Sequence, residues 1–282
     1  MTIHTSGKAS APASVANLGP GFDCLALALE LRCTVEAHPW SEWEIAAADP
    51  DGLIARVARR AVGLHVPMRI SVKSEIPLAK GLGSSAAVTV ATIAACTLAL
   101  GHDPTPAEVF ELAAELEGHP DNAAAAVYGG LVLTTPARMV RRLAVSPELV
   151  VAVAVPEDSL PTHEARAVLP TQVSLDAAAR SVARGVALVE GLRTGDRDLL
   201  AAAGGDELHE PHRMALRSVI GKLAEAARAG GAWLTTLSGA GPAVLAITGA
   251  ADAEAVAKAL TAAASNVTVL RPGIAVDGLR WT

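Results

Sequence analysis

The stretch PLAKGLGSSAAVTVATIAA, residues 77–95, places a loop of glycines and serines directly before a long run of Ala, Val and Thr. This change of composition predicts that a helix begins at Ser84 or Ser85. The first turn of a helix leaves backbone N–H groups unpaired and carries a partial positive charge, which together suit an anion. Gly81 and Gly83 allow a positive φ and a close approach of the backbone to a ligand. The stretch therefore allows two interpretations, an anion site and an ordinary capped loop.

The spacing of these glycines excludes two common nucleotide-binding loops. A Walker A loop needs Gly-Lys-Ser or Gly-Lys-Thr after its glycines, and neither follows here. Gly-Leu-Gly-Ser-Ser-Ala also lacks the G-x-G-x-x-G spacing of a Rossmann loop. The hydroxyl groups of Ser84 and Ser85 can still cap the helix, contact phosphate oxygens or bind Mg²⁺.

Composition and charge narrow the possible functions. Hydrophobic residues make up 51% of the 282 residues and charged residues 18%, which indicates an ordered globular chain. The net charge of −6 argues against nucleic acid as a partner, because phosphate backbones attract basic surfaces. The odd number of cysteines (Cys24, Cys33 and Cys96) and their lack of metal-like spacing indicate a reducing compartment. The apolar run 86–100 is too short to span a membrane comfortably, and no signal peptide is evident after Met1, so we expect a cytoplasmic protein.

Strand-like and helix-like segments alternate along the chain. The expected strands are 8–15, 33–37, 43–47 and 68–74, with extended runs at 131–135, 139–145, 148–156, 233–247 and 266–276. The expected helices are 53–63, 84–100, 106–118, 175–193, 222–229 and 251–263. This mixture predicts an α+β fold with a division near Ser146, giving closely packed lobes of residues 1–146 and 147–282.

Two further glycine-bearing segments lie far from the 77–95 loop in the chain. The first glycine segment is APASVANLGPGFDCLALAL at 11–29, and the third, which follows the 77–95 loop, is LSGAGPAVLAI at 237–247. Together with the 77–95 loop, in this order, they make the sequence similar to the GHMP kinases, and the resemblance extends from about residue 8 to residue 246. Within that family PASVANLGPGFD, EGHPDN and SGAGP most resemble the homoserine kinases.

The resemblance implies a two-lobed GHMP kinase fold. The N-terminal lobe would resemble the second domain of ribosomal protein S5, and the C-terminal lobe would be ferredoxin-like. ATP would lie with its phosphates on the loop and on the helix that follows it. The 238–241 loop would close near the first glycine segment and shape the floor of the site. The implied nucleotide-binding residues are Pro77, Lys80, Gly81, Leu82, Gly83, Ser84, Ser85 and Ala86.

The resemblance also implies a Mg²⁺ ion held by the Ser85 hydroxyl and by a carboxylate from ELAAELEGHPDN. Matching EGH selects Glu117. Glu111 is the alternative, because related kinases often have a longer loop between this carboxylate and the following Asp-Asn pair. Phosphoryl transfer depends mainly on positioning and on charge stabilisation, so no side chain is assigned as a base. The implied catalytic residues are Asp121, Asn122 and Lys80.

The acceptor implied by the resemblance is L-homoserine, which would become O-phospho-L-homoserine for threonine synthesis. Its ammonium, carboxylate and hydroxyl groups require an acid, an arginine and neutral hydrogen-bonding groups. Asp23 would bind the ammonium and Arg166 the carboxylate. The implied substrate-binding residues are Asn17, Asp23, His119, Asp121, Thr162, Arg166, Arg213 and Gly239.

Departures from the family pattern leave alternatives open. In DPDGLIARVARRA, Gly52 stands where relatives carry an Asn that helps to bind adenine, so the identity of the nucleotide is open. A different small alcohol, such as a polyol or an isoprenoid precursor, is an alternative acceptor. A non-catalytic ligand-binding relative is a third hypothesis, which predicts that Ser85, Glu117 and Asp121 fail to converge. A homodimer is possible, since homoserine kinases are often dimeric.

Overall fold

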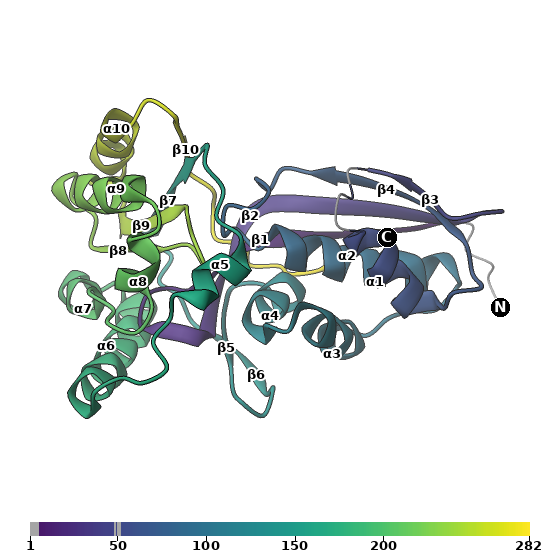
Figure 1. The fold of residues 1–282 in the computed structure, drawn as a ribbon, viewed down its shortest axis with the longest axis horizontal. Coiled ribbons are helices and arrows are strands. Elements are labelled where there is room, and N and C mark those ends of the chain that lie inside the picture. The colour runs from purple at the N-terminus through teal and green to yellow at the C-terminus, as the bar shows by residue number, and fades with distance from the viewer. Residues whose placement is uncertain (1–5, 48, 50–51) are drawn as a thin grey trace.

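Two β-sheets organise the molecule, one built mainly from each half of the chain (Figure 1). The structure, a computed structural model, describes residues 6–47, 49 and 52–282. In the segment DPDGLIARVARRA, Pro50 and Asp51 lie outside the described residues, whereas Gly52 lies within them. The first sheet has seven strands and the second has four, and helices pack on both. The α+β fold is confirmed, and the lobe boundary at residue 146 stays a prediction.

The first sheet follows the order β11-β1-β2-β4-β3, with β5 and β6 attached to β2. Its strands are β1 (Gly7–Asn17), β2 (Gly21–Pro39), β3 (Glu44–Ala46), β4 (Met68–Ser74), β5 (Leu131–Thr134), β6 (Val140–Leu143) and β11 (Arg280–Trp281). All neighbouring strands are antiparallel except β3 and β4, which are parallel.

Strand β2 is much longer than the predicted strand 33–37. Its first half, FDCLALALEL, is rich in Ala and Leu, which favour a helix as readily as a strand. Tertiary pairing decides its conformation, because this half lies between β1 and β5, with Leu25 opposite Leu133. The long hairpin of β1 and β2 carries the first glycine segment at its tip, in the turn at residues 18–20.

Helices α1 (Leu53–Val62), α2 (Ser84–Ala99), α3 (Pro106–Glu117) and α4 (Pro120–Tyr128) lie on one side of the first sheet (Figure 1). Helix α2 is apolar on nearly all sides and buried along most of its length, as expected for a central helix. Its small side chains allow a close approach to β1, where a Cβ at Gly7 would lie 2.0 Å from the Ala95 carbonyl oxygen. Helix α4 was absent from the predicted elements, although Pro120 in its first turn is a common start signal.

The second sheet confirms the ferredoxin-like lobe. Its strands are β7 (Leu149–Pro156), β8 (Leu234–Leu237), β9 (Val244–Gly249) and β10 (Val267–Leu270), in the antiparallel order β10-β7-β9-β8. Helices α9 (Ser218–Ala229) and α10 (Ala253–Ala263) complete a β-α-β-β-α-β succession. Between β7 and α9 the chain adds α5 (Thr162–Ala167), α6 (Leu175–Thr194), α7 (Arg197–Ala203) and α8 (Glu210–Met214).

The C-terminal segment leaves the second sheet and returns to the first. Strand β11 pairs with β1, and the Thr282 N–H donates to the Lys8 carbonyl oxygen at 3.1 Å. Figure 1 accordingly shows the C-terminus over the first half of the molecule. None of the helices in the described part of the chain is both long and apolar enough to cross a bilayer.

Candidate active site

The glycine and serine loop ends where the sequence predicts, because α2 begins at Ser84. Gly83 is the N-cap residue, with φ 65°, and no side chain caps this helix start. Ser84 and Ser85 therefore do not act as caps. No acidic residue lies in the first turn either. A helix start with no side-chain cap and no acidic residue in its own first turn suits an anion such as phosphate.

The second half of the chain holds this loop in place. The Ser238 hydroxyl donates to the Gly81 carbonyl oxygen at 2.7 Å, and the Ala243 N–H donates to the Lys80 carbonyl oxygen at 3.2 Å. A Cβ at Gly81 would lie 2.0 Å from the Ser238 carbonyl oxygen, and φ here is +79°. Gly81 is thus required both by backbone conformation and by the close approach of the third glycine segment.

Asn17 connects the first glycine segment to the third. Its Nδ2 donates to the Gly239 carbonyl oxygen at 2.9 Å, and its Oδ1 accepts from the Asp23 N–H at 3.0 Å. The Gly239 N–H in turn donates to the Ala16 carbonyl oxygen at 3.2 Å. Asn17 is only 5% exposed. Its amide therefore positions Asp23 and Gly239, and direct contact with substrate by Asn17 or Gly239 stays a prediction.

Asp23 and Arg166 form a two-pronged ion pair between the halves of the molecule. The Nη2 and Nη1 atoms of Arg166 donate to Oδ1 and Oδ2 of Asp23 at 2.7 Å and 3.3 Å. Nη2 also lies 3.1 Å from Nδ1 of His119, and the guanidinium carbon lies 5.9 Å from the centre of the Phe22 ring. The Nε atom of Arg166 is buried without a partner among the described residues. The two groups predicted to bind opposite ends of an amino acid thus face each other.

The start of α4 brings three predicted residues together. His119 is the N-cap residue, and burial together with Arg166 lowers the pKa of its imidazole. Asp121 is 3% exposed, and burial raises the pKa of its carboxyl to about 6, with a further upward contribution from Asp23. Asn122 accepts a hydrogen bond from the Ser14 hydroxyl at 2.8 Å. A buried carboxyl that titrates near neutral pH is typical of acid–base chemistry.

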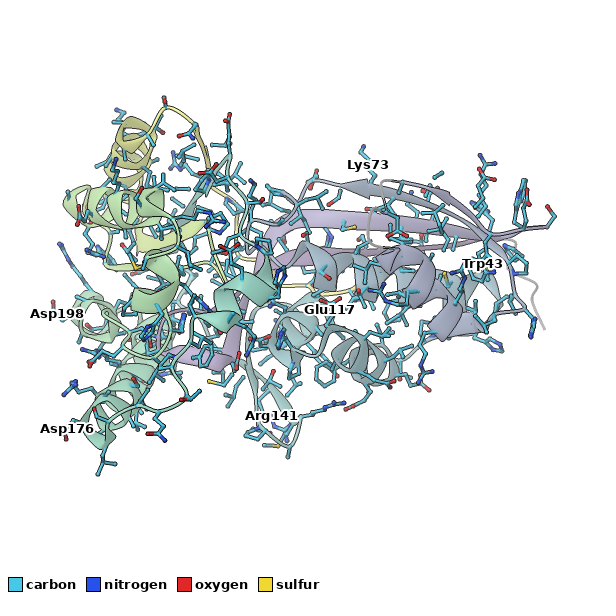
Figure 2. The ribbon with its side chains drawn as sticks, viewed as in Figure 1. Trp43, Lys73, Glu117, Arg141, Asp176 and Asp198 are labelled. Atoms are coloured by element: carbon cyan, nitrogen blue, oxygen red, sulfur yellow. The ribbon has the colours of Figure 1, made fainter. Side chains whose placement is uncertain are left out.

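Glu117 lies beside the start of α2 and is labelled near the middle of Figure 2. Its Oε1 accepts from the Ser85 hydroxyl at 2.8 Å and from the Thr89 hydroxyl at 2.7 Å. Glu111 instead is exposed and faces Arg138, with 3.5 Å between Oε2 and Nη1. The structure therefore brings Glu117, and not Glu111, to the end of the 81–85 loop. Thr89 is absent from the predicted site, although its i+4 spacing from Ser85 on a helix is a signal that could have found it.

Hydroxyl and carboxylate oxygens are the ligands that Mg²⁺ prefers, so Ser85, Thr89 and Glu117 fit this ion chemically. The part of the chain that the structure describes contains no cluster of three or more His, Cys, Asp and Glu side chains suited to a metal. Mg²⁺ is usually bound through one or two carboxylates together with substrate phosphates and water, and this donor set matches that pattern.

Arg213 is buried beside the Phe22 ring. Its Nη1 donates to the Gly239 carbonyl oxygen at 3.2 Å and lies 3.1 Å from Nδ1 of His209, whose ring stacks on Phe22 at 4.9 Å. Nε2 of His209 lies 2.9 Å from the Gly19 carbonyl oxygen. Arg213 and His209 thus support the floor of the site. No local pattern in the sequence marks His209.

Lys80 and Thr162 also belong to the predicted site, as do Leu82 and Ala86, which are buried, and Pro77. Lys80 Nζ donates to the carbonyl oxygens of Glu157 and Asp158 at 2.5 Å and 2.7 Å, which ties the loop to the chain after β7. Its catalytic role stays a prediction. Thr162 is exposed at the first residue of α5, four residues before Arg166, so both lie on the same face of that short helix.

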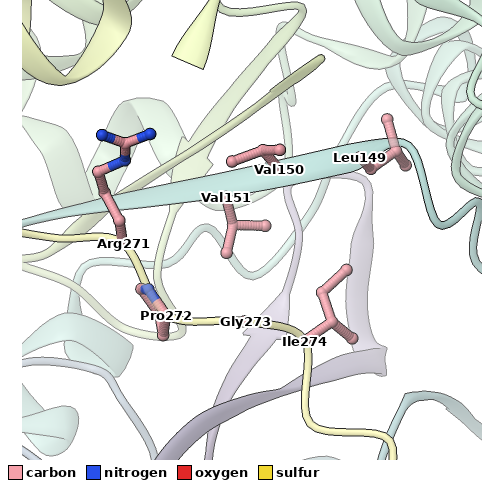
Figure 3. Close-up of a pocket in the computed structure, with 7 residues that line it drawn as sticks. All are labelled: Leu149, Val150, Val151, Arg271, Pro272, Gly273 and Ile274. Carbon is pink, nitrogen blue, oxygen red and sulfur yellow. The ribbon is translucent and has the colours of Figure 1, made fainter. Parts of the chain in front are cut away.

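None of the predicted site residues lines either of two pockets found in the described chain. The first, of about 460 Å³, is lined by Leu149, Val150, Val151, Arg271, Pro272, Gly273 and Ile274 (Figure 3). Its walls are mainly aliphatic, with Arg271 as the charged group. The second, of about 590 Å³, lies among α7, α8, α9 and the start of β8.

Comparisons with known proteins agree with the fold and the glycine segments. Residues 52–130 match the model of the GHMP kinases N terminal domain, and residues 188–266 match that of the GHMP kinases C terminal. Homoserine kinase from Moorella thermoacetica is 41% identical over 251 residues, which cover 83% of this chain and 85% of that protein. Homoserine kinase from Thermus thermophilus is 39% identical over 262 residues, covering 89% and 90%.

Solved structures give the same picture. The crystal structure of homoserine kinase from Cytophaga hutchinsonii is 27% identical, with a TM-score of 0.89 and coverage of 100% of this chain and 99% of that one. L. major mevalonate kinase, solved in complex with R-mevalonate, is 16% identical, with a TM-score of 0.75 and coverage of 97% and 98%. The latter likeness shows a shared fold.

Proposed function

The chain belongs to the GHMP kinase family, and we propose that it transfers the terminal phosphoryl group of ATP to the side-chain hydroxyl of L-homoserine. The chain is a small-molecule kinase, and its relatives at 35% to 41% identity are homoserine kinases. The observation that carries the choice of acceptor is the Asp23–Arg166 pair. One carboxylate and one guanidinium match the ammonium and carboxylate groups of a free amino acid.

On the acceptor side, a zwitterionic substrate would exchange partners with this ion pair. Its ammonium would bind Asp23 and its carboxylate would bind Arg166, so the charge of the site would stay balanced. The unpartnered Nε–H of Arg166 supplies one further donor for a carboxylate oxygen. A neutral polyol carries neither an ammonium nor a carboxylate group to match Asp23 and Arg166, which argues against that alternative.

On the donor side, the phosphates of ATP would lie on the 81–85 loop and the uncapped start of α2. Ser85, Thr89 and Glu117 would hold Mg²⁺, which neutralises phosphate charge when it is bound. Ser85 and Glu117, two of the three residues on which the non-catalytic hypothesis depends, are in contact, which argues against a non-catalytic ligand-binding protein.

During transfer, the acceptor oxygen forms a bond to the terminal phosphorus as the bond to the ADP oxygen breaks, and the hydroxyl proton leaves. We assign Asp121 to that hydroxyl. Burial raises the pKa of Asp121 to about 6, so its carboxyl can accept and release a proton near neutral pH. Asn122, held by Ser14, would orient the same region.

The test is an ADP-release assay with Mg-ATP and a panel of L-homoserine, L-serine, L-threonine, R-mevalonate and myo-inositol. We expect turnover confined to L-homoserine, and turnover on myo-inositol or mevalonate alone would overturn the acceptor assignment. GTP in place of ATP tests the donor, since Gly52 stands at the adenine-side position. The same proposal includes action in the cytoplasm, in keeping with three free cysteines, and a homodimer that light scattering would detect.

A further inference from the structure

The second pocket lies behind α8, and none of the predicted active-site residues lines it. Its volume is about 590 Å³. The lining residues that bear on its chemistry are Asp206, Glu210, Met214, Arg228, Trp233 and Thr235. The pocket therefore combines two carboxyl groups, a hydroxyl and a guanidinium with apolar and aromatic surface, which is the make-up of a small-molecule site.

Two residues that line this pocket, Asp206 and Thr235, each carry a buried polar atom with no hydrogen-bond partner in the described chain. Asp206 is 4% exposed, and its Oδ2 accepts from the N–H groups of His209 and Glu210, both at 2.8 Å. Among the described residues, neither Oδ1 of Asp206 nor the hydroxyl of Thr235, which is 8% exposed, has a hydrogen-bond partner. Buried polar atoms almost always have partners, because leaving one without a partner is destabilising. Both atoms would be satisfied by a hydrogen-bond donor in the pocket.

A positively charged donor suits the site best. Glu210 brings a second carboxyl to the pocket, with one oxygen accepting from the Leu237 N–H at 2.6 Å. Burial raises the pKa of Glu210 to about 8, so a cation beside it would favour its ionised form. An ammonium group carries three donors and a positive charge, and both match these acceptors.

The surroundings favour an organic ligand over a metal ion. The pocket has two carboxyl groups, and the described residues contain no group of three or more His, Cys, Asp and Glu side chains that could hold a metal ion. The volume far exceeds that of one ion, and Trp233, Met214 and Leu234 supply apolar walls. Arg228 is exposed at the edge of the pocket and can bind a carboxylate.

We propose that this pocket is a second ligand site that binds a small primary ammonium compound, with the ammonium on Asp206 Oδ1 and the Thr235 hydroxyl. The apolar part of the ligand packs on Trp233 and Met214. A free amino acid and a simple amine share this chemistry, and Arg228 distinguishes them, because only the amino acid has a carboxylate. The site is independent of the proposed homoserine kinase activity.

The test is isothermal titration calorimetry of the full chain with three probes that share one hydrocarbon chain. L-Norleucine carries both charged groups, pentylamine carries only the ammonium, and hexanoate carries only the carboxylate. We expect norleucine and pentylamine to bind and hexanoate not to bind. Binding of hexanoate as tightly as pentylamine, or no heat from either amine-bearing probe, would overturn the proposal. Because no turnover is measured, this result is separate from success or failure of the kinase assay.

Variants locate the binding. Asp206→Asn keeps an oxygen for the N–H groups of His209 and Glu210 but replaces the free acceptor with a donor. Thr235→Val removes the hydroxyl at nearly constant shape, and it keeps the test decisive if D206N does not fold. We expect each to weaken pentylamine binding by about tenfold or more. Unchanged affinity in T235V would contradict the proposed contact.

Two control variants and one further pocket variant complete the test. Thr92→Val removes another buried, unpartnered hydroxyl, in α2 and outside the pocket, and should leave affinity unchanged. Arg228→Gln should weaken norleucine and not pentylamine if the ligand is an amino acid, and neither if it is an amine. Asp23→Asn should leave norleucine binding intact, whereas a loss would show that the probe binds at the acceptor site and would overturn the proposal.

Discussion

Arg166 on α5 and Asp23 on β2 are 143 residues apart in the chain, yet their side chains form a paired contact of 2.7 Å and 3.3 Å. The pair links a short helix of the second half to the hairpin tip of the first. Both side chains are partly exposed, at 34% and 45%. The pair is thus accessible to a substrate, and its value to stability is small because solvent screens it.

Replacing Asp23 with Asn should therefore affect binding of the acceptor more than folding. We expect the KM for L-homoserine to rise about tenfold or more, because a charge-assisted hydrogen bond to the ammonium is lost, with the KM for ATP unchanged. Steady-state kinetics and urea unfolding measure the two effects. Glu190→Gln, which breaks the exposed Glu190–Arg193 pair, is the control and should change neither KM. Equal effects of D23N on both substrates would contradict the assignment.

The two glutamates of α3 should respond oppositely to substitution. Glu117→Gln should lower kcat by about 10- to 100-fold and raise the Mg²⁺ concentration needed for half-maximal rate, since a carboxylate near the phosphates is lost. Glu111→Gln should leave both quantities unchanged, because Glu111 faces Arg138. A Mg²⁺ titration of the rate distinguishes the two. A larger effect of E111Q would show that Glu111, the alternative given in the sequence analysis, binds the metal.

The pH dependence of kcat/KM should report Asp121. Its pKa is raised from 3.8 to about 6 by burial, so the carboxyl is protonated below about pH 6 and ionised above it. If the ionised form is required, kcat/KM rises with pH and levels off above about 6, falling about tenfold per pH unit on the acid side. Asp121→Asn should be slow and should lack this acid limb. An acid limb in D121N that matches the wild type would assign the titration to another group.

Gly81 and Gly118 make a matched pair for the contact between the loop and the third glycine segment. Both have positive φ, +79° and +72°, but a Cβ at Gly81 meets the Ser238 backbone whereas one at Gly118 meets nothing within 4 Å. Gly118→Ala should cost about 1–2 kcal/mol of unfolding free energy, from backbone conformation alone. Gly81→Ala should cost more, by about 1–3 kcal/mol, because of the added clash. Equal losses of unfolding free energy in the two variants, measured with urea, would show that the contact between Gly81 and Ser238 accommodates a Cβ without strain.

Local chemistry explains what the sequence predicts well. The start of α2 follows from a change of composition between residues 83 and 86, and α3 follows from the capping box of Thr105 and Glu108. The first half of β2 is not predictable in this way, because its partner β5 lies about a hundred residues further along the chain. Strand pairing supplies information that local propensity lacks.

The site shows the same limit. Resemblance identifies Asp23 and Arg166, but their mutual contact depends on how α5 packs against the hairpin. Likewise, the sequence does not decide between Glu111 and Glu117, because only the packing of α3 against α2 determines which one faces Ser85. His209 and Arg213 both contact the Phe22 ring, and nothing in their neighbouring sequence indicates that ring.

The return of residues 273–282 to the first sheet has a consequence for the order of folding during synthesis. The Ala275 N–H donates to the Ala28 carbonyl oxygen, and the Ala275 carbonyl oxygen accepts from the Gly130 N–H. The Leu279 N–H donates to the Val127 carbonyl oxygen, and β11 pairs with β1. A ribosome that has completed the N-terminal half has therefore made a sheet whose outer edge at β1 is still open. That edge is closed only when residues 273–282 emerge, so the first sheet is completed after the second half of the chain has been made.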